Sequence, residues 1–183
     1  MSSAVEKDRI APLAIVVMGV SGSGKSTLGA LLAARLHATF LEGDSFHSEA
    51  NVAKMRGGIP LTDEDRWPWL DRLGGAMAEA VVRDGLVVAA CSALRRGYRE
   101  RLTVATGTPI VFVLLDTAQT ELARRLGNRP GHYMPASLLD SQLRTLERPS
   151  GDEPAVIFDS SEAPEILCDK VLEWLPRRML EAR

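Results

Sequence analysis

Residues 13–32 read LAIVVMGVSGSGKSTLGALL, and this stretch decides the fold. It opens with a continuous apolar run, Leu13–Met18, which is typical of a strand covered on both faces of a sheet. A glycine-rich turn follows, and leucines then recur at helical spacing from residue 25 to residue 37. The stretch therefore predicts a buried strand, a tight turn and an amphipathic helix in immediate succession.

The rest of the chain continues this alternation. Further strands are expected at 39–41, 86–90, 109–115 and 155–158. Helices are expected at 48–57, 63–84, 94–105, 117–127, 136–147 and 164–180, with a bend or interruption at Pro68. Alternating strands and helices predict an α/β fold, a five-stranded parallel sheet with helices on both faces. Ligands of such sheets bind beyond the carboxyl ends of the strands.

Length and composition restrict the classes of protein. A chain of 183 residues suits one domain, so we expect a flexible tail at 1–12 and a single domain at 13–183. The net charge of −2 argues against a nucleic-acid partner. No apolar run is long enough to span a membrane. Cys91 and Cys168 read as buried free thiols, which suit the reducing cytoplasm.

The turn after the first strand carries a phosphate-binding motif. Residues 19–26, GVSGSGKS, match the pattern GxxxxGK[ST] between a strand and a helix. In this motif backbone N–H groups surround phosphate oxygens, the lysine reaches the β- and γ-phosphates, and the hydroxyl ligates Mg²⁺. Lys25 and Ser26 take these two roles, so the expected cofactors are ATP and Mg²⁺. The predicted ATP-binding residues of the loop are Gly19, Val20, Ser21, Gly22, Ser23, Gly24, Lys25, Ser26 and Thr27.

Polar residues after the second strand suggest an acceptor site. Asp44 can accept a proton from an attacking hydroxyl or hold a metal-bound water, although an aspartate there can also cap a helix. His47 is a ligand-contacting residue or a packed one. Arg66, between Asp65 and Trp67, either stacks or clamps a carboxylate, or it is a surface arginine beside a packed pair of tryptophans.

Two groups of arginines follow later in the chain. Arg95 and Arg99, with Tyr98, leave the carboxyl end of the third strand and either bind substrate or form a solvated helix face. Arg125 and Arg129 are four residues apart, on one face of a helix that enters a glycine- and proline-rich loop. They belong either to a mobile lid at 126–135 that closes over ATP or to a salt-bridged helix end.

Several longer blocks carry a family resemblance. They are GVSGSGKST at 19–27, FLEGDSFH at 40–47, NVAKMRGGIPLTDEDRWPWL at 51–70, CSALRRGYRERL at 91–102, RPGHYM at 129–134 and LLDSQLRTLERP at 138–149. With these blocks the chain resembles small P-loop gluconokinases, which are related in fold to shikimate and adenylate kinases.

The resemblance implies an ATP-dependent transfer of phosphate to the 6-hydroxyl of D-gluconate, giving 6-phospho-D-gluconate and ADP. It also implies a nucleoside-monophosphate-kinase-like sheet in the order 2-3-1-4-5 and a homodimer. Lys25, Asp44 and Arg129 would be catalytic, and Arg125 would bind ATP. The implied substrate-binding residues are Asp44, His47, Arg66, Arg95, Tyr98, Arg99 and His132.

Two alternatives remain open from the residues alone. One is a P-loop kinase for another small acceptor, such as shikimate or a nucleoside monophosphate. The other is a nucleotide-dependent switch, which would hydrolyse ATP slowly and without an acceptor.

Overall fold

A computed structural model describes residues 11–127 and 136–175 of the chain. Its centre is a five-stranded sheet in the order β2-β3-β1-β4-β5, in which all neighbouring strands run parallel. The predicted sheet and its strand order are therefore confirmed. The strands are β1 (Leu13–Met18), β2 (Thr39–Glu42), β3 (Leu86–Ala90), β4 (Ile110–Asp116) and β5 (Ala155–Asp159).

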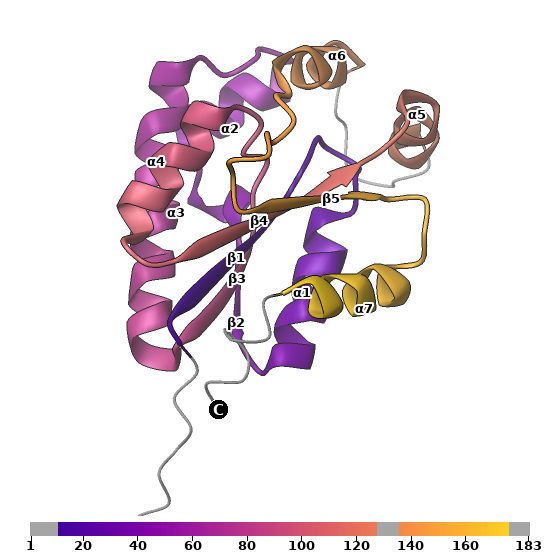
Figure 1. Cartoon of the computed structure of the whole chain (residues 1–183). Helices are drawn as coiled ribbons and strands as arrows, with labels where there is room; N and C mark the ends of the chain where they lie inside the picture. Colours follow the sequence, from indigo (N-terminus) through magenta and orange to yellow (C-terminus); the bar gives the residue numbers. More distant parts are fainter. Residues whose placement is uncertain (1–10, 128–135, 176–183) are drawn as a thin grey trace, which may run out of the picture.

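Helices cover both faces of this sheet (Figure 1). They are α1 (Lys25–Leu36), η1 (Gly43–Phe46), α2 (Glu49–Arg56), α3 (Asp63–Asp84), α4 (Arg96–Thr106), α5 (Gln119–Gly127), α6 (Ala136–Thr145) and α7 (Pro164–Trp174). In the figure α3 and α4 lie on one side of the sheet, whereas α1 and α7 lie on the other. None of the helices within the described ranges is long and apolar enough to cross a membrane.

The first strand sits at the centre of the sheet because all of its residues are apolar. Val16 pairs with Ala89 on one side and with Phe112 on the other. All six residues of β1 are fully buried, so this strand has no solvent-facing side. Burying each large apolar side chain contributes roughly 1.5–3 kcal/mol, which makes β1 a rigid base for the loop that follows it.

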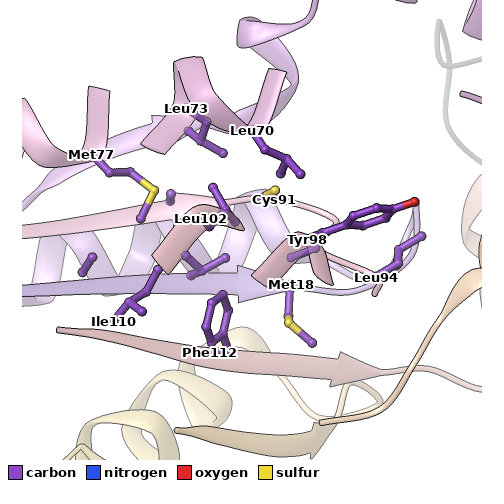
Figure 2. Packing of buried hydrophobic residues seen from close by; sticks show 14 of the residues in the cluster. Met18, Leu70, Leu73, Met77, Cys91, Leu94, Tyr98, Leu102, Ile110 and Phe112 are labelled. Atoms are coloured by element: carbon purple, nitrogen blue, oxygen red, sulfur yellow. The ribbon is translucent and has the colours of Figure 1, made fainter. Parts of the chain in front are cut away.

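The cluster beneath α3 and α4 joins both helices to the sheet. Figure 2 shows Leu70 and Met77 of α3, Leu102 of α4 and Phe112 of β4 pointing into one buried layer. Tyr98 lies at the edge of this layer with its hydroxyl directed away from it. The apolar ring of Tyr98 therefore belongs to the core, while its oxygen remains available to polar groups.

Helix α3 has a well-defined start. Thr62 Oγ1 accepts a hydrogen bond from the Asp65 N–H at 3.2 Å, and Asp65 Oδ2 accepts one from the Thr62 N–H at 2.9 Å. Lys54 Nζ lies 2.7 Å from Asp65 Oδ1, and these hydrogen bonds hold the pKa of Asp65 below its usual value. This reciprocal cap fixes the first turn, from which Arg66 projects.

The expected interruption at Pro68 is wrong, because α3 continues through it to Asp84. Pro68 lies in the second turn, where its missing N–H removes a single hydrogen bond close to the helix start. The other boundaries agree with the predictions to within a few residues. The last helix ends at Trp174, short of the predicted 180, because Leu175 leaves the helical conformation with a ψ of 128°. The tail at residues 1–10 and most of the proposed lid lie outside the described residues.

Candidate active site

The phosphate loop follows β1 directly and requires glycine at several positions. Gly19, Gly22 and Gly24 have φ values of 145°, 82° and 98°, which L side chains rarely adopt. A Cβ on Gly19 would also lie 2.8 Å from Ser23 Oγ and 2.9 Å from the Leu115 carbonyl oxygen. The loop is therefore packed closely against the end of β4.

Helix α1 begins at Lys25, so its first unpaired N–H groups open toward the loop. Lys25 Nζ donates to the Val20 carbonyl oxygen at 3.0 Å, across the loop. Ser26 and Thr27 follow in the first turn and are exposed. The helix start thus combines one cation, two hydroxyls and the positive end of a helix dipole, which together suit a polyphosphate.

A cavity of about 370 Å³ lies on one side of the loop. Gly22, Gly24 and Thr27 line it, together with Ser160 and Leu167. It lies between the loop and the start of α7, where it is open to solvent on one side. A cavity next to a phosphate loop with an apolar wall can accept the base and sugar of a nucleotide.

Arg125, predicted to bind ATP, also lines this cavity. Its Nη2 donates to the Ser160 carbonyl oxygen at 2.7 Å, and its Nη1 lies 3.3 Å from the Ser23 carbonyl oxygen. Its Nε donates to Glu121 at 2.7 Å, and the hydrogen bonds from Arg124 and Arg125 lower the pKa of Glu121 to about 2. Arg125 is thus a salt-bridged residue of α5 that also ties the loop to the turn after β5.

A second cavity lies on the other side of Lys25. Asp44, His47 and Arg66 line it, together with Ser21 and Lys25 of the phosphate loop. The structure therefore brings together three of the predicted acceptor residues with the phosphate-binding lysine. Ser92, Leu138, Ser141 and Gln142 also line this cavity and were missed by the sequence reasoning, although the last three belong to the block at 138–149.

Asp44 is positioned by close packing at the end of β2. A side chain on Gly43 would collide with the Ala90 carbonyl, so only glycine lets this turn approach the end of β3. The indole Nε1 of Trp69 donates to the Gly43 carbonyl oxygen at 2.8 Å and is buried. These two contacts hold the turn that carries Asp44, whose carboxylate is exposed to the cavity.

Arg66 is a buried cation that forms no ion pair with a carboxylate among the described residues. Its side chain is 9% exposed, and its Nε has no hydrogen-bond partner within residues 11–127 and 136–175. Its guanidinium carbon lies 5.2 Å from the centre of the Tyr98 ring. Because an unpaired buried charge is costly, this arrangement favours a ligand that brings a negative charge to Arg66.

His47 is a neutral residue of the same cavity. Its ring stacks on Trp69 with a centroid distance of 4.1 Å. Burial lowers the pKa of His47 to about 4, since the opposing effect of Asp44 is smaller and the nearby Arg66 adds to the shift. At neutral pH the imidazole is therefore uncharged and can contribute hydrogen bonds, but no charge, to a ligand.

The residues leaving β3 differ from one another. Arg95 and Tyr98 both contact Asp63, with Arg95 Nη1 at 3.2 Å and the Tyr98 hydroxyl donating at 2.5 Å. Burial and this hydrogen bond raise the pKa of Tyr98 to about 12. Neither residue lines the acceptor cavity, so the structure places them in the wall behind Arg66.

Arg99 is fully engaged inside the protein. It is 2% exposed, its Nε donates to Glu153 at 2.6 Å, and its Nη1 donates to the carbonyl oxygens of Ala93 and Glu147 at 3.1 Å. These contacts correct the prediction that Arg99 binds substrate, because they leave its donors directed into the fold. Arg129 and His132 lie outside the described residues, and their roles stay predictions.

Fold and site together define the class of protein. A phosphate loop between a nucleotide cavity and an acceptor cavity, with a carboxylate across from its lysine, is the arrangement of a P-loop kinase for small molecules. A family model described as an AAA domain matches residues 15–149.

Similarity to known proteins identifies the family within this class of kinases. A gluconokinase of Gluconobacter oxydans is 48% identical over 88% of this chain and 90% of its own length. The thermosensitive gluconokinase of Escherichia coli is 43% identical over 78% of this chain and 75% of its own. The crystal structure of a gluconokinase from Sinorhizobium meliloti superposes with a TM-score of 0.83 at 43% identity, covering 94% and 97% of the two chains. The chain belongs to the gluconokinase family. A shikimate kinase from Aquifex aeolicus, with a TM-score of 0.51 at 18% identity, shares the fold alone.

Proposed function

We propose that this protein is a gluconokinase that transfers the γ-phosphoryl group of ATP to the 6-hydroxyl of D-gluconate. The products are 6-phospho-D-gluconate and ADP. The observation that carries the proposal is the acceptor cavity, in which Asp44 and Arg66 lie beside Lys25 and Arg66 has no carboxylate partner within residues 11–127 and 136–175. Gluconate has a hydroxyl at one end and a carboxylate at the other, and these two residues match the two groups. The names of the relatives, all gluconokinases, support the same acceptor.

The residues divide the reaction between them. Lys25 holds the β- and γ-phosphate oxygens and offsets the negative charge that shifts toward the leaving ADP. The oxygen of the 6-hydroxyl forms a bond to the γ-phosphorus while the bond from that phosphorus to the β–γ bridging oxygen breaks. Asp44 accepts the proton that the 6-hydroxyl loses. Arg66 binds the carboxylate and so sets which hydroxyl reaches the phosphate. His47, neutral at working pH, contributes a hydrogen bond to the acceptor.

The residues at the helix start also fit Mg²⁺. Ser26 presents an exposed hydroxyl in the first turn of α1, and Asp44 faces the same loop. Within the described residues no group of three His, Cys, Asp or Glu side chains is placed to hold a metal. An ion at Ser26 would therefore take its other ligands from phosphate oxygens and water, as Mg²⁺ commonly does. Bound there, it would neutralise charge on the β- and γ-phosphates.

The other roles follow from position or from family likeness. The loop residues from Gly19 to Thr27 bind the phosphates of ATP, and Arg125 contacts the nucleotide from its cavity. Arg129 and His132 act at the lid, on the nucleotide and the acceptor respectively. Family likeness further suggests a homodimer. The two buried free thiols suit a cytoplasmic protein, and the net charge of −2 argues against a nucleic-acid partner.

The test is a panel of acceptors. The purified protein is supplied with ATP, Mg²⁺ and either gluconate, another sugar acid, a polyol or shikimate, and ADP formation is followed by a coupled assay. We expect gluconate to give the highest kcat/KM and phosphorus–carbon coupling in the product to locate the phosphate on C6. Lys25→Met protein serves as the inactive blank. ADP formation that does not depend on any acceptor would favour the switch, and faster turnover of shikimate would overturn the choice of acceptor.

A further inference from the structure

One peptide unit of the phosphate loop is held at both ends by side chains. The carbonyl oxygen of the Val20–Ser21 peptide accepts from Lys25 Nζ at 3.0 Å and from the Ser23 N–H at 3.2 Å. Its N–H, which belongs to Ser21, donates to Gln142 Oε1 at 2.7 Å. The plane of this peptide is therefore set by Lys25 on one side and on the other by Gln142, which lies 121 residues beyond Ser21 in the chain.

This peptide lies at the junction of the two cavities. Gly22 and Gly24 line the nucleotide cavity, whereas Ser21 and Lys25 line the acceptor cavity. A phosphoryl group moving from ATP to an acceptor must pass this point. Ser21 and Gln142 both line the acceptor cavity, and there the Ser21 N–H donates its hydrogen bond to Gln142 Oε1.

Helix α6, which carries Gln142, is anchored to the rigid part of the fold. Just beyond its end, the Glu147 N–H donates to the Leu94 carbonyl oxygen at 2.8 Å. Glu147 Oε2 accepts from the Arg96 N–H at 2.8 Å, and the Glu147 carbonyl accepts from Arg99. The position of Gln142 is therefore determined by the buried network around Arg99 and not by local chain preference.

We propose that Gln142 is a positioning residue for phosphoryl transfer, acting through the Val20–Ser21 peptide, whose carbonyl oxygen accepts a hydrogen bond from Lys25 Nζ. This inference rests on the proposed function, because the transfer step that Gln142 would affect is the phosphorylation of gluconate. The N–H of this peptide donates to Gln142 and not to the phosphoryl group, so the donor that acts on the phosphates is Lys25, and removing one such donor from a transition state typically lowers kcat by about 10²–10³. Loss of Gln142 leaves Lys25 in place but frees the peptide that positions it, so the expected loss of kcat is smaller, about tenfold.

The first test compares Gln142→Met with Arg144→Met. Both residues lie on α6, and Arg144 is exposed, so the second variant controls for methionine in this helix. In Gln142→Met we expect kcat to fall about tenfold while KM for ATP and for gluconate changes less than about twofold, since an orientation effect acts on the transfer step. A kcat within about twofold of wild type would overturn the proposal, as would an equal loss in Arg144→Met.

The second test observes the hydrogen bond itself and does not depend on activity. In ¹⁵N-serine-labelled protein, the Ser21 amide resonance is identified by its loss in Ser21→Ala. It should move upfield in Gln142→Met and stay near its wild-type position in Gln142→Glu, which keeps an oxygen acceptor. An unmoved resonance in Gln142→Met would overturn the inference. If the methionine variant does not fold, Gln142→Asn, whose shorter side chain does not reach the Ser21 N–H, gives the same test. Failure of the proposed function would show instead as a wild-type protein that does not phosphorylate gluconate.

Discussion

Arg66 and Arg99 are two buried arginines with opposite surroundings. Arg99 is 2% exposed and donates to both Glu153 oxygens, at 2.6 and 2.9 Å, as well as to main-chain carbonyls. Arg66 is 9% exposed, and no carboxylate pairs with it in the described part of the chain. Burial alone therefore does not indicate a binding role. The two arginines differ in whether a carboxylate of the protein pairs with the guanidinium: Glu153 pairs with Arg99, and no described carboxylate pairs with Arg66.

This difference assigns the two arginines to different tasks. Arg99 joins α4, the end of β3 and the segment before β5, so it stabilises the wall of the site. Arg66 faces a cavity that also contains Lys25 and Asp44, so its missing partner is expected from the substrate. Variants on the Arg99 side should change folding, and variants on the Arg66 side should change catalysis.

The largest effect is expected from breaking the internal pair. Glu153→Gln leaves the Arg99 charge buried without its counter-ion, which typically costs about 3–5 kcal/mol of stability. The matched control is Asp71→Asn. Asp71 pairs with Arg101, which lies on α4 like Arg99, but both side chains of this second pair are 45% exposed. Urea denaturation should show a large loss for the first variant and little change for the second. Equal losses of unfolding free energy in the two variants would contradict the expected difference between the buried Arg99–Glu153 pair and the exposed Arg101–Asp71 pair.

Asp44→Asn should be the most severe change on the catalytic side. The amide cannot accept the proton of the attacking hydroxyl, so kcat should fall about 100-fold or more, equivalent to at least about 2.7 kcal/mol of activation free energy. The free energy of unfolding should stay close to wild type because Asp44 is exposed. Steady-state kinetics with saturating ATP measure this directly. A variant that loses only affinity for ATP, with kcat intact, would contradict the acceptor role.

Arg66→Met should weaken the acceptor and not the nucleotide. Hydrogen bonds to charged groups contribute about 1.5–3 kcal/mol, so kcat/KM for gluconate should fall roughly 10- to 100-fold. KM for ATP should change little. The sharper form of the experiment adds the corresponding polyol, which has no carboxylate: wild type and Arg66→Met should use it about equally poorly. A variant that loses activity equally toward the acid and the polyol would place Arg66 elsewhere in the reaction.

The smallest effect concerns pH and His47. The pKa of His47 is lowered from 6.5 to about 4 in the folded protein, chiefly by burial. Between these values the unfolded chain binds more protons, so stability falls as the pH decreases from 6.5 toward 4. His47→Asn should reduce this pH dependence. Denaturation series at several pH values test this, and parallel curves for wild type and His47→Asn would contradict the lowered pKa.

Local patterns in the sequence were sufficient for most of the fold. Continuous apolar runs predicted the buried strands, and their alternation with helical spacing predicted the parallel sheet. The strand order came from family resemblance, since neighbours in this sheet are far apart in the chain. Pro68 shows the limit of a local rule, because the cap at Thr62 and the packing of α3 keep the helix intact around it.

The phosphate loop was determined by the sequence itself, because its donors are backbone N–H groups of consecutive residues and its glycines adopt their conformations locally. The acceptor side was decided by the tertiary structure. Arg66 and Arg99 looked equally suitable as substrate-binding residues, and only the placement of Glu153, 54 residues beyond Arg99, turned one of them into a structural residue. Gln142 carried no chemical signal until folding brought it to the Ser21 N–H. The role of such a side chain depends on the group that it pairs with in the fold. That group belongs to an element far away in the chain, and the local sequence does not specify which elements come together.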